Sequence, residues 1–267
     1  MSKAGDYLKH LKSGIRANRK TFIFYTVIRI LVILTLVRCI LLGNYQGAML
    51  CVLSLLLFLV PAFLEDTFKI SIPPLFQAII IGFIFAAEIL GEINHFYVAI
   101  PGWDTMLHTM NGFLCGAVGF SLIYLLNKDS KNVNLSPFYL ALVAFCFSMT
   151  VGVVWEFFEF GMDQLFLLDM QKDFIVQDIG SVTLDPQNMG TPIQVTGITD
   201  TVIHTAEGKD VIVKGGYLDI GIIDTMKDLW VNLLGALAFC VIGYFTLKLS
   251  KNSKVTDNLV IRPREEK

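Results

Sequence analysis

Charged residues are scarce in this chain of 267 residues, at 16%, whereas a soluble domain carries about 25%. Mean hydropathy is +0.63, and the formal net charge is −2 at pH 7. The low charge and the long apolar runs exclude a soluble globular enzyme and a disordered chain. A nucleic-acid binder is excluded because no basic excess is present to hold phosphates. The composition therefore predicts a polytopic membrane protein with the lipid bilayer as its main partner.

Cysteine is sparse where an exported segment would use it. The five cysteines all lie inside apolar runs, and none has metal-ligand spacing or lies in the polar segment 163–224. We therefore expect no disulfide framework and interpret them as small buried apolar residues. The sequence also contains no internal repeat, no Gly-rich phosphate loop and no low-complexity tract.

Six apolar runs are long enough to cross a membrane, because a hydrocarbon core of ~30 Å needs about 20 helical residues. In lipid such runs must be helices, since each backbone polar group has to be satisfied within its own segment. The second run has the least defined end, because Pro61 and two acids follow it. The runs are 22–42, 46–64, 74–94, 104–126, 137–162 and 226–248.

Lysine and arginine are distributed unequally between the two sides of these runs. Fifteen lie in the termini and in the loops at 65–73 and 127–135, and three lie on the alternate side. The positive-inside rule then places both termini in the cytoplasm, in a cell (plasma or inner) membrane. The expected parts are a basic cytoplasmic segment 1–21, helices 1–5 within 22–162, an acidic extracytoplasmic insert 163–224, helix 6 at 225–249 and a basic cytoplasmic tail 250–267.

The insert has ten carboxylates against three lysines. Short β-type runs at 193–196 and 210–214 are separated by turn-like residues at 207–209 and 215–216, which predicts a small β-hairpin subdomain. The expected fold class is therefore all-α and polytopic, with six transmembrane helices, both termini inside, and a small β-rich outer insert. The insert is either a solvated lid without a ligand of its own or a surface that docks a partner.

Ionisable residues inside the expected helices need a reason, because a carboxylate there costs about 2.5–3.5 kcal/mol on insertion scales. Within each helix they are spaced by three or four residues and so share one face. Helices 3 and 5 carry them in their last turns and helices 4 and 6 in their first turns, so all four groups are expected at one depth near the outer leaflet. By helix they are Glu88 and Glu92; Asp104 and His108; Glu156, Glu159 and Asp163; Asp224 and Asp228, with the amide of Asn232 on the same face.

So many carboxylates at one depth cannot all stay ionised without compensation. Two like charges at close range repel each other by roughly several kcal/mol at an effective dielectric constant of ~20. Some acids are protonated with raised pKa values, or Arg38, Lys227 and His108 supply cations, or a divalent metal binds. Carboxylates with one imidazole suit Mg²⁺, Mn²⁺, Ca²⁺ or Zn²⁺, and the pattern does not choose among them. Asp104 and Asp224 have a plainer alternative as helix N-caps.

The order of these motifs resembles the YjdF-type bacterial inner-membrane proteins over about 75–245, and parts of it are more distantly similar to VanZ-like proteins linked to glycopeptide resistance. That family has no assigned activity, so the resemblance supports the site and implies no reaction. The insert at 163–223 is longer than the connection expected in that family. The motifs are Glu88-x-x-x-Glu92, Trp103-Asp104-x-x-x-His108-x-x-Asn111-Gly112, Trp155-Glu156-x-x-Glu159 and Asp224-x-x-x-Asp228-x-x-x-Asn232-x-x-Gly235.

Three functions follow from this pattern. The first is a metal-dependent enzyme or ligand site for a lipid or lipid-linked substrate, with His108 as general base and Asp104 as its orienter. The second is an ion- or proton-coupled carrier that uses the acids as relays, and the third is a non-catalytic membrane or envelope factor. In the first, the metal ligands would be Glu88, Glu92, Glu156, Glu159 and Asp228, with Asp224, Asn232, Asn111 and Arg38 in supporting positions.

Overall fold

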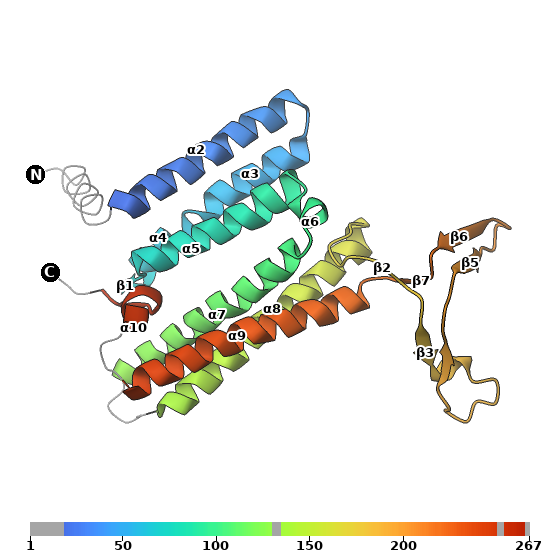
Figure 1. Cartoon of the computed structure of the whole chain (residues 1–267). Helices are drawn as coiled ribbons and strands as arrows, with labels where there is room; N and C mark the ends of the chain where they lie inside the picture. The colour runs from blue at the N-terminus through green and yellow to red at the C-terminus, as the bar shows by residue number, and fades with distance from the viewer. Residues whose placement is uncertain (1–18, 130–134, 250–253, 265–267) are drawn as a thin grey trace, which may run out of the picture. The chain divides into compact units, whose positions relative to one another are not determined.

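The computed structural model describes residues 19–129, 135–249 and 254–264, so most of the expected basic segment 1–21 lies outside the described residues. Six described helical spans are long and apolar enough to cross a membrane, which confirms the predicted number. Figure 1 shows their order along the chain. The spans are Arg19–Leu41, Tyr45–Phe68, Pro74–Ile93, Trp103–Asn127, Pro137–Phe166 and Ile222–Leu249.

The chain divides into two compact units, of which the first is Met1–Gly152 with Val231–Lys267 and the second is Val153–Trp230. The helices α8 (Pro137–Phe166) and α9 (Ile222–Leu249) each contribute residues to both units. The two units are described separately below.

The second span of the first unit is interrupted. It consists of α3 (Tyr45–Leu57) and α4 (Val60–Phe68), and so it extends beyond the expected end at residue 64. Pro61 lies in the first turn of α4. A proline ring collides with the carbonyl four residues earlier, here that of Leu57, where α3 ends. The proline therefore divides the span without ending it.

The third span changes its helix type. It begins as α5 (Pro74–Ile84) and continues as a π-helix, η1 (Phe85–Ile93), followed by the short α6 (Phe96–Ala99). The Asn94 backbone N–H donates to the Ile89 carbonyl, five residues back, at 3.1 Å. Together with α2 (Arg19–Leu41) and α3, this span encloses one apolar core of the unit. Its buried residues are Ile28, Val32, Cys39, Cys51, Phe58, Ile81, Ile89 and Ile93.

A second core of the first unit lies along α7 (Trp103–Asp129), where glycines allow close approach to α9. A Cβ at Gly112 would lie 2.0 Å from the Asn232 carbonyl oxygen, and one at Gly235 would lie 2.0 Å from the Thr109 carbonyl oxygen. Such contacts are typical of small-residue packing between membrane helices. Any larger residue at either position would force the two helices apart.

The C-terminal tail folds back onto the first unit instead of remaining a simple basic extension. After α10 (Lys254–Leu259), the buried Val260 and Ile261 enter the second core, and the Ile261 N–H donates to Ser121 Oγ at 3.0 Å. The strand β8 (Arg262–Pro263) then pairs antiparallel with β1 (Ile70–Ser71). Arg264 forms an ion pair with Asp66 at 2.9 Å.

The insert belongs to the second unit and consists of short antiparallel strand pairs, as the β-type runs predict. β2 (Phe174–Val176) pairs with β7 (Tyr217–Asp219), and β3 (Ile179–Ser181) pairs with β4 (Ile193–Val195). Between β3 and β4 lies a 3-10 turn, Val182–Leu184. The longest pair is the hairpin of β5 (Asp200–His204) and β6 (Asp210–Lys214).

Candidate functional site

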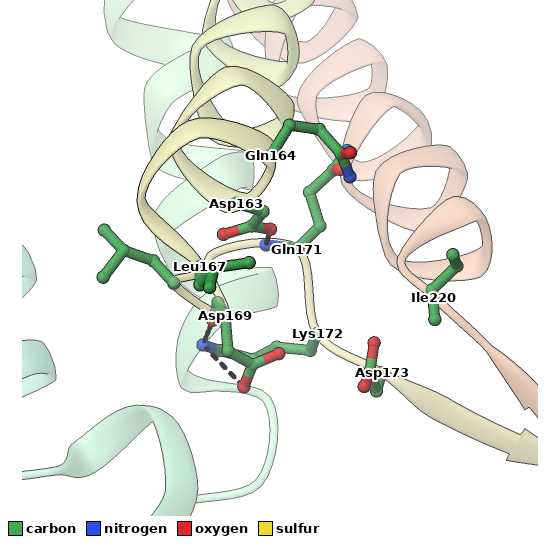
Figure 2. Close-up of a pocket in the computed structure, with 9 residues that line it drawn as sticks. Asp163, Gln164, Leu167, Asp169, Gln171, Lys172, Asp173 and Ile220 are labelled. Atoms are coloured by element: carbon green, nitrogen blue, oxygen red, sulfur yellow. Dashed lines mark hydrogen bonds and ion pairs between the residues drawn. The ribbon is translucent and has the colours of Figure 1, made fainter. Parts of the chain in front are cut away.

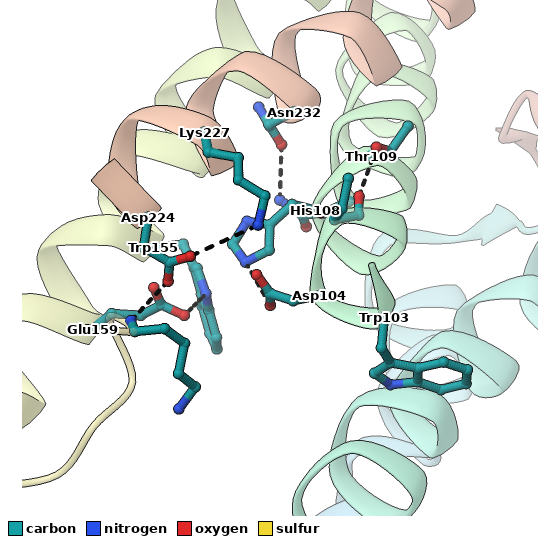
Figure 3. A network of polar contacts seen from close by, with 12 residues as sticks. Trp103, Asp104, His108, Thr109, Trp155, Glu159, Asp224, Lys227 and Asn232 are labelled. Atoms are coloured by element: carbon teal, nitrogen blue, oxygen red, sulfur yellow. Dashed lines mark hydrogen bonds and ion pairs between the residues drawn. The ribbon is translucent and has the colours of Figure 1, made fainter. Parts of the chain in front are cut away.

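In the first unit, the start of α7 positions Asp104 and His108. The Trp103 indole N–H donates to the Ala86 carbonyl at 3.3 Å, and its ring lies edge-on to Phe96 at 5.0 Å, so the first turn of α7 is held in place. One turn later, His108 Nε2 lies 3.5 Å from Asp104 Oδ1 (Figure 3). His108 is 9% exposed. A carboxylate next to an imidazole orients the ring.

Two amides link α7 to α9 within the same unit. Asn111 Nδ2 donates to Asn232 Oδ1 at 3.1 Å, and Asn232 is almost fully buried. A Cβ at Gly152 of α8 would lie 2.6 Å from Asn232 Nδ2, so three helices meet at this side chain. Ser148 Oγ donates to the Gly112 carbonyl at 2.8 Å at the same point. Asn111 and Asn232 therefore join the helices to each other.

The remaining expected residues of the first unit are less enclosed. Glu88 and Glu92 both lie in η1, where Glu88 is half-buried and Glu92 is exposed. The Arg38 guanidinium donates to Asn94 Oδ1 at 3.3 Å, so this cation contacts the amide that closes η1. Glu92 is thus the more weakly supported of the two expected ligands, and Arg38 has a role in fixing the end of the π-helix.

In the second unit, the acids of α8 are buried. Glu156 is 4% exposed and Glu159 is 7% exposed. The Trp155 indole N–H donates to Glu159 Oε1 at 2.7 Å, which fixes one carboxylate oxygen (Figure 3). Two glutamates spaced by three residues share one helix face. They form the acidic pair of α8.

The acids of α9 are buried as deeply, and they differ in what they contact. Asp224 Oδ2 accepts the Lys172 backbone N–H at 2.8 Å, and Lys227 Nζ lies 3.9 Å from Asp224 Oδ1 (Figure 3). The N-terminus of α9 is capped by Asp219, which accepts the Ile223 N–H at 3.0 Å. Asp224 is therefore not the cap, and the sequence pattern missed Asp219. Asp228 is fully buried within the same helix.

Asp163 braces the chain where α8 ends. Its two carboxylate oxygens accept the backbone N–H groups of Met170 at 2.7 Å and Gln171 at 2.8 Å. A cleft of about 490 Å³ opens beside this turn (Figure 2). Its lining is Asp163, Gln164, Leu167, Leu168, Asp169, Gln171, Lys172, Asp173 and Ile220.

The cleft carries more negative than positive charge. Desolvation raises the pKa of the Asp173 carboxyl, and the negative charges of Asp169, Asp163 and Asp219 raise it further, while Lys172 lowers it. Lys172 forms an ion pair with Asp169 at 3.5 Å. The excess of acidic residues in the insert therefore includes a concave surface at the point where the chain leaves α8.

The chemistry available in the second unit is that of hard oxygen donors. Glu156, Glu159, Asp224 and Asp228 are each at least nine-tenths buried. Carboxylates are the ligands that Mg²⁺, Ca²⁺ and Mn²⁺ prefer. In the first unit, the Asp104–His108 pair offers a proton acceptor with its orienting carboxylate.

Six apolar spans with polar groups buried along them define a multi-pass membrane protein. The chain belongs to the DUF2238 family, described as a predicted membrane protein family, whose model matches residues 23–249. This assignment is consistent with the YjdF-type resemblance of the motifs. No curated protein and no solved structure matched the chain.

Proposed function

We propose that this protein binds a divalent metal through the buried carboxylates of α8 and α9 and acts on a lipid or lipid-linked substrate near the outer leaflet. The proposed ligands are Glu156, Glu159 and Asp228. The supporting observation is the burial of four carboxylates within one unit of the chain, at exposures of 1–7%. Buried carboxylates in a membrane span are costly and mark functional sites.

Buried carboxylates need compensating positive charge, and this need supports a bound metal over carboxylates that are surrounded by apolar side chains alone. The desolvation of an uncompensated buried ion costs roughly several kcal/mol, even after the protein around it relaxes. Lys227 lies next to Asp224 and compensates part of that charge. A divalent cation would compensate two further charges and would supply Lewis-acid chemistry when bound.

The proposal assigns the general base to His108, with Asp104 as its orienter. Its support is the 3.5 Å pair on α7 and the sequence-based depth, which places the polar ends of helices 3 to 6 near one leaflet. Glu88 and Glu92 are proposed as further ligands on the same sequence argument. Asn111, Asn232, Asp224 and Arg38 serve as positioning residues.

The site is proposed to face outside, in a plasma or inner membrane, with both termini in the cytoplasm. The distribution of lysine and arginine supports this orientation. From the VanZ-like resemblance we propose only that the substrate belongs to the cell envelope. Labelling of single cysteines placed in residues 205–209 and 265–267 of intact cells would test the orientation, because only the first should react from outside.

Metal content of the purified protein tests the central proposal. The full chain in detergent is expected to contain a stoichiometric divalent metal, which Glu156→Gln and Asp228→Asn should remove. Glu207→Gln is the matched control, because Glu207 lies exposed in the β5–β6 turn. Thermal unfolding of each variant separates loss of metal from loss of fold. A chain with no bound metal, or a metal retained by both site variants, contradicts the proposal.

The base assignment has its own test. Bacterial lipid extract incubated with the metal-loaded chain should give a converted lipid, detected by mass spectrometry. His108→Ala should keep the metal and stop the conversion. If the metal binds and no lipid class is converted, the site is a ligand site and the enzymatic part of the proposal is wrong.

A non-catalytic membrane factor is the second candidate, and one observation favours it. Asp163 and Asp224 use their carboxylates to hold the backbone of residues 170–172, which is a structural role. If the other buried acids act similarly, acid-to-amide variants should lower the unfolding temperature and leave metal content at zero throughout.

A further inference from the structure

The β5–β6 hairpin has a defined turn that sets its register. The Thr205 N–H donates to the Lys209 carbonyl at 3.1 Å, the Gly208 N–H donates to the Thr205 carbonyl, and Gly208 has a φ of +77°. From there, Val211 pairs with Ile203 and Val213 pairs with Thr201. At the far end, the Gly215 N–H donates to the Thr199 carbonyl at 2.8 Å. Both ends of the ladder are therefore fixed.

The register determines which backbone groups of β6 point away from β5. Antiparallel pairs alternate between hydrogen-bonded and non-hydrogen-bonded. Pairs 205–209 and 199–215 are hydrogen-bonded, so the bonded pairs between them are those of Val211 and Val213. The backbone N–H and C=O groups of Asp210, Ile212 and Lys214 therefore point to the other edge. Among the described strands, β6 pairs with β5 and with no other.

The side chains of β6 have a symmetric order. It reads Asp210-Val211-Ile212-Val213-Lys214, with an acid at one end, a base at the other and Ile212 at the centre. Val211 is 52% exposed and Ile212 is 58% exposed. An open edge with exposed apolar side chains is a template for another strand. A second β6 running antiparallel, with Ile212 opposite Ile212, places each Asp210 opposite a Lys214.

We propose that two copies of this chain associate through their β6 edges to form a four-stranded antiparallel sheet, β5–β6–β6–β5. Each of Asp210, Ile212 and Lys214 would then exchange backbone hydrogen bonds with the partner strand, because their N–H and C=O groups already point outward. The register centred on Ile212 is the one that uses these groups and opposes the charges.

Charge complementarity extends across all four strands. Asp200 lies opposite Lys214 in the hairpin, and His204 Nδ1 lies 2.8 Å from Asp210 Oδ1. In the proposed sheet, one row reads Asp200, Lys214, the partner's Asp210 and the partner's His204, so each acid lies between basic side chains or next to one. The central row on the same face is Val202 and Ile212 followed by the partner's Ile212 and the partner's Val202. Opposite charges and apolar pairs across strands each stabilise a sheet. A parallel arrangement would instead place Asp210 beside the partner's Asp210.

Disulfide crosslinking of the full chain in membranes tests the edge that pairs. The two Ile212 positions would be adjacent, at about 5.5 Å between Cα atoms, which a disulfide can bridge. Ile212→Cys should therefore give a covalent dimer on mild oxidation. Val202→Cys, on the same face of β5, should give none, because three strand spacings of about 4.8 Å separate it from its copy. The chain without added cysteine gives the background of its five native cysteines.

Charge reversal tests the register in the Ile212→Cys background. Asp210→Lys alone and Lys214→Asp alone each oppose like charges at both ends of the strand pair, so each should weaken dimerisation about tenfold. Co-expression of the two variants restores both opposite-charge pairs and should restore the mixed dimer. This rescue does not depend on either variant forming its own dimer. Absence of an Ile212→Cys dimer, stronger crosslinking of Val202→Cys, or absence of rescue in the mixture overturns the proposal.

Discussion

The contact between α7 and α9 in the first unit and the insert in the second unit are held together by different means. In the first, glycine removes side chains so that backbones touch, with the Asn111–Asn232 bond at the same place. In the insert, short strand pairs and carboxylate-capped turns dominate, and apolar residues such as Val202 and Ile212 stay about half exposed. Because of this difference, we expect the same type of substitution to lower the free energy of unfolding strongly in the first region and to lower it slightly, or even raise it, in the second.

The largest effect is expected for Gly112→Ala. The new Cβ would lie 2.0 Å from the Asn232 carbonyl oxygen, which is backbone and cannot rotate away. Overpacking of this kind should cost about 3 kcal/mol of unfolding free energy. Denaturant unfolding of the detergent-purified chain measures it.

Gly161→Ala is the control in the second unit, because a Cβ there would meet nothing within 4 Å. Alanine in a helix interior is favoured over glycine by about 0.5–1 kcal/mol, so this variant should be neutral or stabilised. Equal destabilisation by both substitutions would contradict the close contact at Gly112.

A second contrast uses the truncation of an isoleucine. Ile261 is 6% exposed in the first unit's core, and Ile261→Ala should weaken docking of the tail by about 2 kcal/mol. Trypsin cleavage after Arg264, which is not followed by proline, should accelerate correspondingly. Ile220→Ala is the matched change in the second unit, where the side chain is 73% exposed, and it should leave the tail unaffected. Unchanged cleavage in Ile261→Ala would mean that this side chain does not anchor the tail.

A smaller effect is expected for the turn at Asp185. The carboxylate accepts the N–H groups of Gln187, Met189 and Thr191, and these bonds hold the pKa of Asp185 below its usual range. A lowered pKa means that the stabilisation is present above the ordinary pKa and is lost as pH falls through the folded value. Asp185→Asn should therefore increase proteolysis within 185–191 at neutral pH and remove its acid dependence. An unchanged pH profile in this variant would show that another group titrates.

The smallest effect on stability is expected at Asp173 in the cleft. Its pH dependence has the opposite sign to that of Asp185. Because burial and neighbouring acids raise the pKa of Asp173, the charged form is disfavoured in the folded state. Its contribution to stability falls as pH rises through the folded pKa. Asp173→Asn should raise the unfolding temperature slightly at neutral pH and leave it unchanged in acid. Destabilisation at neutral pH would instead indicate that the carboxylate binds a cation.

The number of spans could be predicted from sequence because lipid dictates both helix length and helix type. The runs expected at 22–42 and 137–162 correspond to Arg19–Leu41 and Pro137–Phe166. The hairpin at 210–214 was also predictable, because β-prone residues and a glycine turn lie close together in the chain. These features depend on local sequence alone.

Features that depend on distant residues could not be predicted in this way. Pairing of β1 with β8 joins residues 70 and 263, and neither strand has a strong pattern of its own. Capping of α9 was one of two alternatives for Asp224, whereas the Asp219 carboxylate accepts the N–H of the first turn, because the helix begins at Ile222, earlier than the apolar pattern indicates. For the site, the spacing placed Asp104 near His108. The Asn111–Asn232 bond joins two helices, and the bracing role of Asp163 depends on a turn, so neither could be predicted from spacing or composition.

The π-helix η1 has a consequence for the bilayer. The third span is the shortest of the six, at 20 residues, and nine of these are π-helical. A π-turn holds more residues than an α-turn, so each residue adds less height along the axis. The span therefore falls short of the ~30 Å that 20 α-helical residues would cross. A span that is too short is accommodated by local thinning of the bilayer or by snorkelling of its flanking residues, so we expect headgroups and water closer to Glu88 and Glu92 than residue counting indicates.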